Sequence, residues 1–135
     1  MSSAGSCPEP LLVFDATVLH HFALADRLDV LADLVVGRAA ATTSVVLSEL
    51  GESGKRHPAL RAAMALDWIE VIALDSLAEI RCFAEWVRRV GAGDRDRGEA
   101  SVFAAAQLRH GIAITDDRAA KRVGLAYGLP VHGTV

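Results

Sequence analysis

The feature that most constrains the fold of this chain is the alternation of short apolar runs with helical segments. The run at residues 11–14 (LLVF) is continuous and apolar, which is typical of a buried strand. Further strands are expected, in chain order, at Ala39–Thr42, Trp68–Ala73, Ile112–Thr115 and Val131–Thr134. Strands that alternate with helices favour a parallel sheet with helices on both faces, so we predict an α/β domain.

The helices between these strands are predicted from apolar spacing and from residues that cap or end helices. Ser76 is expected to cap a helix, and Gly91–Asp96 is expected to form a loop. The predicted helices cover Val18–Ala25, Leu28–Val36, Ser44–Leu50 (with Thr43 or Ser44 as cap), Pro58–Leu66, Leu77–Val90, Arg97–His110 and a last helix that begins at Asp116 or Asp117 and ends at Tyr127.

Length and composition limit the domain organisation and the class of protein. The chain has 135 residues, of which 52% are hydrophobic, so we expect one folded domain over residues 11–135 after a flexible tail at residues 1–10. Its two cysteines form no C-x-x-C pair, and its apolar runs are too short to cross a membrane. The first ten residues lack the features of a signal peptide, so a cytoplasmic protein is expected.

The charge balance poses a question that the placement of the acids answers. With 17 acidic and 14 basic residues the formal charge is −3, which argues against binding nucleic acid through overall positive charge. Yet Asp15 follows the first strand, and Asp116 and Asp117 follow the fourth. Glu49 and Glu99 lie in helices whose first turns are expected at the same edge of the sheet. Because the carboxyl ends of parallel strands share one edge, we expect these acids to converge there.

Each acid also has a structural alternative. Asp15 could only cap the first helix, and Glu49 could be a solvated helix residue. Asp96 and Glu99 have the spacing of a capping box, and one of Asp116 and Asp117 could cap the last helix. All of these acids together are harder to explain without a cation, because clustered carboxylates repel one another. Mg²⁺ or Mn²⁺ would relieve this repulsion through carboxylate ligands.

Four segments carry a resemblance to a known family. They are LLVFDATVL (11–19), TTSVVLSEL (42–50), DRGEASVFAAA (96–106) and GIAITDDRAAKRVG (111–124). In this order they resemble the PIN domain, a nuclease fold common among the VapC-like toxins of type II toxin–antitoxin pairs. The resemblance implies a three-layer α/β/α fold with a mostly parallel sheet of about five strands. It also implies a metal-dependent ribonuclease that hydrolyses RNA phosphodiester bonds with Mg²⁺ or Mn²⁺, binds a cognate antitoxin and forms a homodimer.

The resemblance also assigns roles to residues. The catalytic acids would be Asp15, Glu49, Glu99 and Asp117, and the metal ligands would be these four together with Asp116, which could share or take the role of Asp117. Thr17 and Thr115 would support the site by hydrogen bonds to a carboxylate or to water. Arg97 and Arg118 could contact RNA phosphates, although surface ion pairs explain them equally well.

Three other interpretations stay open at this stage. The chain could be a catalytically weak PIN-like module that binds protein or RNA. It could, less plausibly, be a phosphatase of the haloacid dehalogenase type, a family that wants a second Asp at the position of Thr17. His20 and His21 follow Asp15 in the first helix and could act as acid or base, but packing or surface exposure is the better interpretation.

Overall fold

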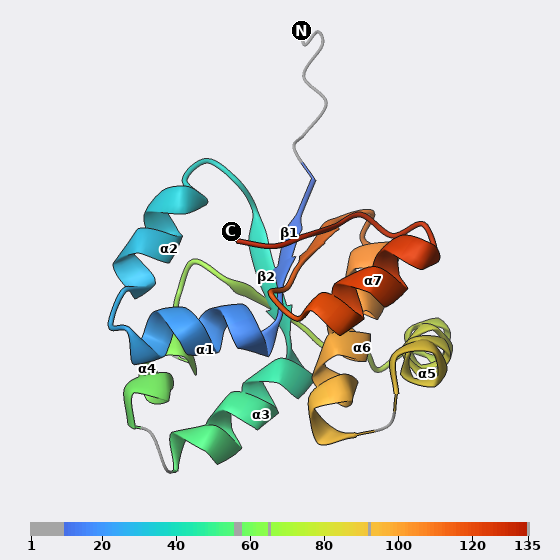
Figure 1. Cartoon of the computed structure of the whole chain (residues 1–135), viewed down its shortest axis with the longest axis horizontal. Helices are drawn as coiled ribbons and strands as arrows, with labels where there is room; N and C mark the ends of the chain where they lie inside the picture. The colour runs from blue at the N-terminus through green and yellow to red at the C-terminus, as the bar shows by residue number, and fades with distance from the viewer. Residues whose placement is uncertain (1–9, 56–57, 65, 92, 135) are drawn as a thin grey trace, which may run out of the picture.

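The computed structural model describes residues 10–55, 58–64, 66–91 and 93–134 (Figure 1). The tail predicted at residues 1–10 therefore lies outside the described residues except for Pro10. The elements in chain order are β1 (Leu12–Phe14), α1 (Ala16–Leu24), α2 (Leu28–Leu34), β2 (Ala40–Thr43), α3 (Ser44–Gly54), the 3₁₀ turn η1 (Pro58–Leu60), α4 (Arg61–Met64), β3 (Glu70–Ile72), α5 (Leu77–Val90), α6 (Asp94–Leu108), β4 (Ile112–Ile114), α7 (Arg118–Ala126) and β5 (Val131–His132).

The five strands form one parallel sheet in the order β3-β2-β1-β4-β5. β1 lies at its centre, with Val13 opposite Ala41 of β2 on one side and Ala113 of β4 on the other. In Figure 1, α1, α2 and α4 lie on one side of β1 and β2, and α5, α6 and α7 lie on the other. The predicted three-layer α/β/α fold with a parallel sheet of five strands is confirmed.

The core surrounds the two central strands and helix α6. Every residue of β1 and β2 is buried. The small residues of β2 form a strand because it lies between two other strands of a parallel sheet. Trp86 of α5 packs edge-on against Phe103 of α6, with ring centroids 5.3 Å apart, and donates its Nε1 hydrogen to Gln107 at 2.7 Å. None of the helices in the described ranges is long and apolar enough to cross a membrane.

Helix caps explain where two predicted helices begin. Ser76 forms the capping box that begins α5: its hydroxyl accepts from the Glu79 N–H, and its own N–H donates to the Glu79 carboxylate. Thr43, rather than Ser44, caps the start of α3, since its Oγ1 accepts a hydrogen bond from the Val46 N–H at 3.1 Å. The predicted end of α3 at Leu50 was wrong, because the helix continues to Gly54.

Helix α6 begins three residues earlier than predicted. Gly93 takes the extended backbone of an N-cap, so the helix starts at Asp94 and the predicted loop Gly91–Asp96 is shorter. Asp96 and Glu99 consequently both lie inside the helix. The capping-box alternative for Glu99 was therefore wrong, and its carboxylate needs another explanation.

Candidate functional site

Asp15 begins the site at the carboxyl end of β1. It caps α1 and is only 1% exposed. Its Oδ2 atom accepts hydrogen bonds from the Thr17 hydroxyl at 2.7 Å and the Thr17 N–H at 3.3 Å. The D-x-T spacing thus buries a carboxylate and fixes its orientation with the helix that it starts. Capping is one role of Asp15, and its buried neighbours suggest a second.

Glu99 reaches the same point from α6. The Thr115 hydroxyl, at the end of β4, lies 3.0 Å from Asp15 Oδ2 and 3.1 Å from Glu99 Oε1. Thr115 has one hydroxyl hydrogen, so it cannot donate fully to both carboxylates. Both acids are buried, Glu99 being 2% exposed. Two carboxylates from distant parts of the chain therefore share one hydroxyl in the interior.

The environment of Glu99 favours its neutral form. Burial, a hydrogen bond with Asp15 and the negative charge of Asp15 raise the pKa of Glu99 to about 11, despite the opposing hydrogen bond from Thr115. Glu99 Oε2 is buried and has no hydrogen-bond partner among the residues that the structure describes. A proton or a cation is therefore required to neutralise this pair.

Glu49 of α3 approaches the same helix. A Cβ atom on Gly98 would lie 2.2 Å from Glu49 Oε1 and 2.8 Å from Oε2, so the Glu49 carboxylate rests against the backbone beside Glu99. Only a glycine at position 98 permits this contact. The structure thus places Glu49 against Gly98, the residue before Glu99, and this contact depends on a residue that the sequence analysis did not single out.

Asp116 and Asp117 accept hydrogen bonds from other partners, although the negative charge of Asp117 also helps to raise the pKa of Glu99. Asp117 caps α7 by accepting the Ala120 N–H at 3.1 Å. Asp116 accepts hydrogen bonds from the backbone N–H of Thr134 at 2.8 Å and from its hydroxyl at 2.7 Å. These bonds hold the segment after β5 against Asp116. Within the described ranges, no three His, Cys, Asp or Glu residues form a group arranged to hold a metal ion. Among the predicted metal ligands, Asp15 and Glu99 are brought together by the Thr115 hydroxyl.

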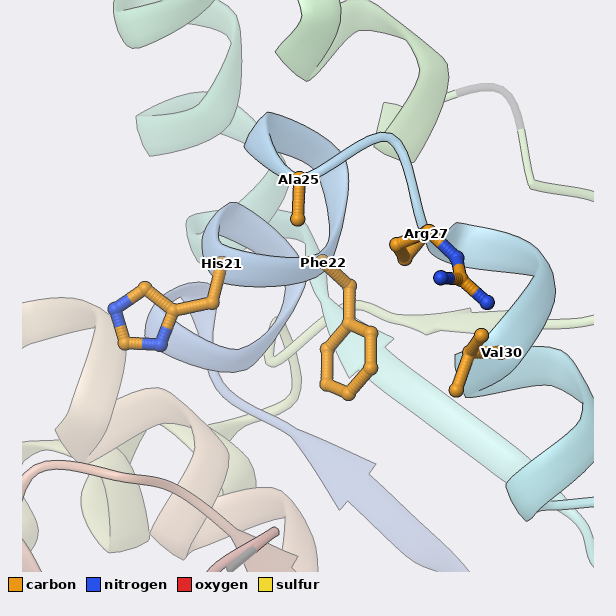
Figure 2. A pocket seen from close by; sticks show the side chains of 5 residues that line it. All are labelled: His21, Phe22, Ala25, Arg27 and Val30. Carbon is orange, nitrogen blue, oxygen red and sulfur yellow. The ribbon is translucent and has the colours of Figure 1, made fainter.

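Two hollows share His21 as a lining residue, and one of them adjoins the acid pair. The polar hollow, of about 400 Å³, is lined by His21, Thr115, Asp116, Arg118, Lys121 and Gly133. The other, of about 320 Å³, lies between α1 and α2 and is mostly apolar; Figure 2 shows the Phe22, Arg27 and Val30 side chains around it and His21 pointing away from them. Because Thr115 contacts both acids, the polar hollow adjoins the acid pair.

Sequence reasoning missed several residues of this region. It did not consider Lys121, Thr134 or Gly98. Its interpretation of His21 as a packing or surface residue agrees with a side chain that is 66% exposed, although His21 also lines both hollows. For Lys121 a signal existed, since it follows Arg118 by three residues and lies on the same helix face. Arg118 lines the polar hollow as its predicted role would require, whereas Arg97 is exposed on α6 and is not among the residues that line it.

Comparison with known proteins identifies the class to which this fold and site belong. The PIN domain family model matches residues 11–135, so the chain belongs to the PIN domain family. This membership places the chain outside the haloacid dehalogenase-type phosphatases. No curated protein matches its sequence.

Several solved structures share the fold of this chain. VapBC2 of Rickettsia felis, bound to a DNA fragment from its promoter, superposes with a TM-score of 0.66 at 13% identity, covering 91% of this chain and 98% of that one. DNA-bound VapBC of Salmonella typhimurium superposes with a TM-score of 0.65 at 18% identity, covering 92% of this chain and 98% of that one. The PIN domain endonuclease Utp24 superposes with a TM-score of 0.62 at 14% identity, covering 93% of this chain and 85% of that one. The chain therefore has a VapC-like PIN fold.

Proposed function

We propose that this protein is a divalent-metal-dependent endoribonuclease that hydrolyses RNA phosphodiester bonds. The observation that carries the proposal is the buried pair of Asp15 and Glu99, which meets at the carboxyl edge of the sheet. Burying two adjacent carboxylates costs folding free energy, which a purely structural site would avoid. Ligand sites of parallel sheets lie at this edge. The PIN family membership and the similarity to the endonuclease Utp24 support the same activity.

The residues present fit a hard divalent ion. Asp15 and Glu99 would hold it, and the buried Glu99 Oε2 offers an oxygen that lacks a hydrogen-bond partner in the described part of the chain. Glu49 lies against Gly98, the residue before Glu99, and would act nearby or through water together with Asp117 and Asp116. When bound, Mg²⁺ or Mn²⁺ would supply electrostatic stabilisation of negative charge on the phosphate. Thr17 and Thr115 hold Asp15 in place for that task.

The toxin role forms the second part of the proposal. The solved neighbours include VapBC complexes, which supports a cognate antitoxin as partner of this chain. Leu24, Leu34 and Val36 are 45%, 65% and 77% exposed on and after α1 and α2. Exposed apolar side chains of this kind suit a protein interface, either in a homodimer or with an antitoxin. Size-exclusion chromatography with light scattering measures the oligomeric state directly.

Metal removal tests the activity. The purified protein is expected to cut single-stranded or structured RNA at internal bonds in millimolar Mn²⁺ or Mg²⁺. Cleavage of the RNA is expected to stop in EDTA and to return when metal is restored in excess. Gel electrophoresis of labelled RNA separates internal cutting from trimming of the ends. Cutting that continues unchanged in EDTA would contradict the proposal.

The alternative of a binding module with weak activity rests on one specific observation. Asp116 accepts two hydrogen bonds from Thr134, and Asp117 accepts one from Ala120, so both carboxylates already have other partners. On this alternative the protein would bind RNA or an antitoxin without cutting RNA at any metal concentration. The same incubation, combined with a binding measurement, decides between the two.

Gly98→Ala is expected to displace Glu49 and to reduce RNA cleavage by about 10- to 100-fold, because misplacing a supporting group by about 1 Å has effects of this size. Stability should change little, since alanine favours the helix and the Glu49 side chain can move. Gly54→Ala in α3 is the matched control: its Cβ would lie an ordinary 3.5 Å from Arg61 Cγ. Equal cleavage by the two variants would show that the position of Glu49 is unimportant.

A further inference from the structure

We infer that the polar hollow binds a phosphodiester of the nucleic-acid strand beside the bond to be cut, through Arg118 and Lys121, with His21 also lining the hollow. The inference rests on the proposed function and deepens it, because it locates the site that binds the substrate strand next to the acid pair. It depends on three observations: the place of the hollow, the charges of its walls, and the engagement of the one acid within it.

The place of the hollow puts it next to the acid pair. Thr115 lines the hollow and also contacts Asp15 and Glu99 with its hydroxyl. A strand with one phosphate at the acid pair would therefore place a neighbouring phosphate in or near the hollow. Its volume of about 400 Å³ falls within the range of about 300–1,000 Å³ that is common for ligand sites.

The charges of the walls favour an anion. Arg118 and Lys121 stand three residues apart in the first turn of α7, where the positive end of the helix dipole adds to their charge. Neither side chain forms an ion pair with an acid in the described ranges, so both are available to a ligand. Arg118 can contact a phosphate through two hydrogen bonds, and Lys121 adds a point charge.

The one acid in the hollow does not oppose this assignment. Both oxygens of Asp116 accept hydrogen bonds from Thr134, and His21 Nδ1 lies 3.9 Å from Asp116 Oδ2. The carboxylate is thus engaged by neighbours on two sides. His21, whose side chain is 66% exposed, also lines the hollow, where its ring can donate a hydrogen bond to an anion.

The test measures binding without cleavage. In an Asp15→Asn background and in EDTA, a short fluorescent RNA is titrated by anisotropy at several salt concentrations. Arg118→Gln/Lys121→Gln is expected to raise the Kd about tenfold and to reduce the slope of log Kd against log salt by about 1.4, since each contact to a single strand contributes about 0.7. Lys55→Gln/Arg81→Gln is the matched control, because it removes the same two residue types from exposed positions outside α7.

The outcomes separate this inference from the proposed function. Equal losses in the two double variants would reflect general charge alone and would overturn the inference. An unchanged Kd and slope in Arg118→Gln/Lys121→Gln would also overturn it, even if the wild type cuts RNA in Mn²⁺. If the wild type cuts no RNA, and RNA binding is weakened in Arg118→Gln/Lys121→Gln but not in the control variant, the phosphate site is supported and the nuclease activity is rejected. Displacement of the RNA by an equal concentration of a nucleoside monophosphate would indicate a small phosphate ligand rather than a strand, against the inference.

Discussion

Replacing Glu99 by glutamine is expected to stabilise the metal-free protein by about 3 kcal/mol at pH 7, or about 10 °C in thermal midpoint. The reason lies in the pKa of Glu99, which its buried place beside Asp15 raises from 4.5 to about 11. The folded protein at pH 7 must keep a proton on Glu99 that the unfolded chain releases. Glutamine keeps the shape of the neutral acid without this cost.

The raised pKa also fixes the sign of the pH dependence. Below pH 4.5 both the folded and the unfolded protein carry the proton, so Glu99 contributes no difference in stability. Between pH 4.5 and about 11 only the folded protein keeps it, and this residue lowers the free energy of unfolding by about 1.4 kcal/mol per pH unit. The advantage of Glu99→Gln should therefore be small near pH 4.5 and should grow as the pH rises.

Thermal unfolding of the two proteins from pH 5 to pH 9 in EDTA measures this effect. Glu52→Gln is the control, because Glu52 is exposed and its replacement should change stability by less than about 0.5 kcal/mol. Millimolar Mn²⁺ should stabilise the wild type and leave Glu99→Gln nearly unchanged, which narrows the gap between them. A Glu99→Gln protein that is less stable than the wild type at pH 8 would mean that Glu99 is ionised and well paired in the folded state.

Asp15→Asn is expected to reduce RNA cleavage in Mn²⁺ by at least about 100-fold. A metal site contributes several kcal/mol of transition-state stabilisation, and each 1.4 kcal/mol corresponds to a factor of ten. The fold should survive, because asparagine caps helices as well as aspartate does and its carbonyl can still accept from Thr17. The loss would then report the missing negative charge rather than an unfolded protein.

Initial rates on one labelled RNA, with thermal midpoints measured in parallel, test this prediction. Asp33→Asn on α2 makes the same chemical change at an exposed position away from the acid pair and should cut RNA at the wild-type rate. Residual cutting of equal rate in Asp15→Asn and the wild type would point to a contaminating nuclease and would contradict the proposed activity.

The fold could be predicted from the sequence because its signals are local. A short apolar run predicts β1, and Ser76 as a cap predicts the start of α5. The start of α6 was placed too late, since the extended backbone of Gly93 has no clear signature in a glycine-rich stretch. Likewise, nothing local distinguishes Asp116 from Asp117 as the cap of α7, because the choice depends on Thr134.

The site was only partly predictable because its contacts join distant segments. The acids at strand ends follow from topology, and Asp15 and Glu99 meet as expected. Their shared hydroxyl comes from Thr115, a hundred residues after Asp15, and could be given a role only through the family resemblance. The fit of Glu49 against Gly98 and the place of Lys121 in the polar hollow require coordinates, since each depends on how two elements pack.

The most direct test of the account is the number of protons released when Mn²⁺ binds. Isothermal titration calorimetry at pH 7 in two buffers of different ionisation enthalpy gives that number. We predict that the wild type binds Mn²⁺ and releases about one proton, because the ion must replace the proton on Glu99, and that Glu99→Gln releases none. Binding by the wild type without proton release, or no binding at millimolar Mn²⁺, would contradict a metal site at Asp15 and Glu99.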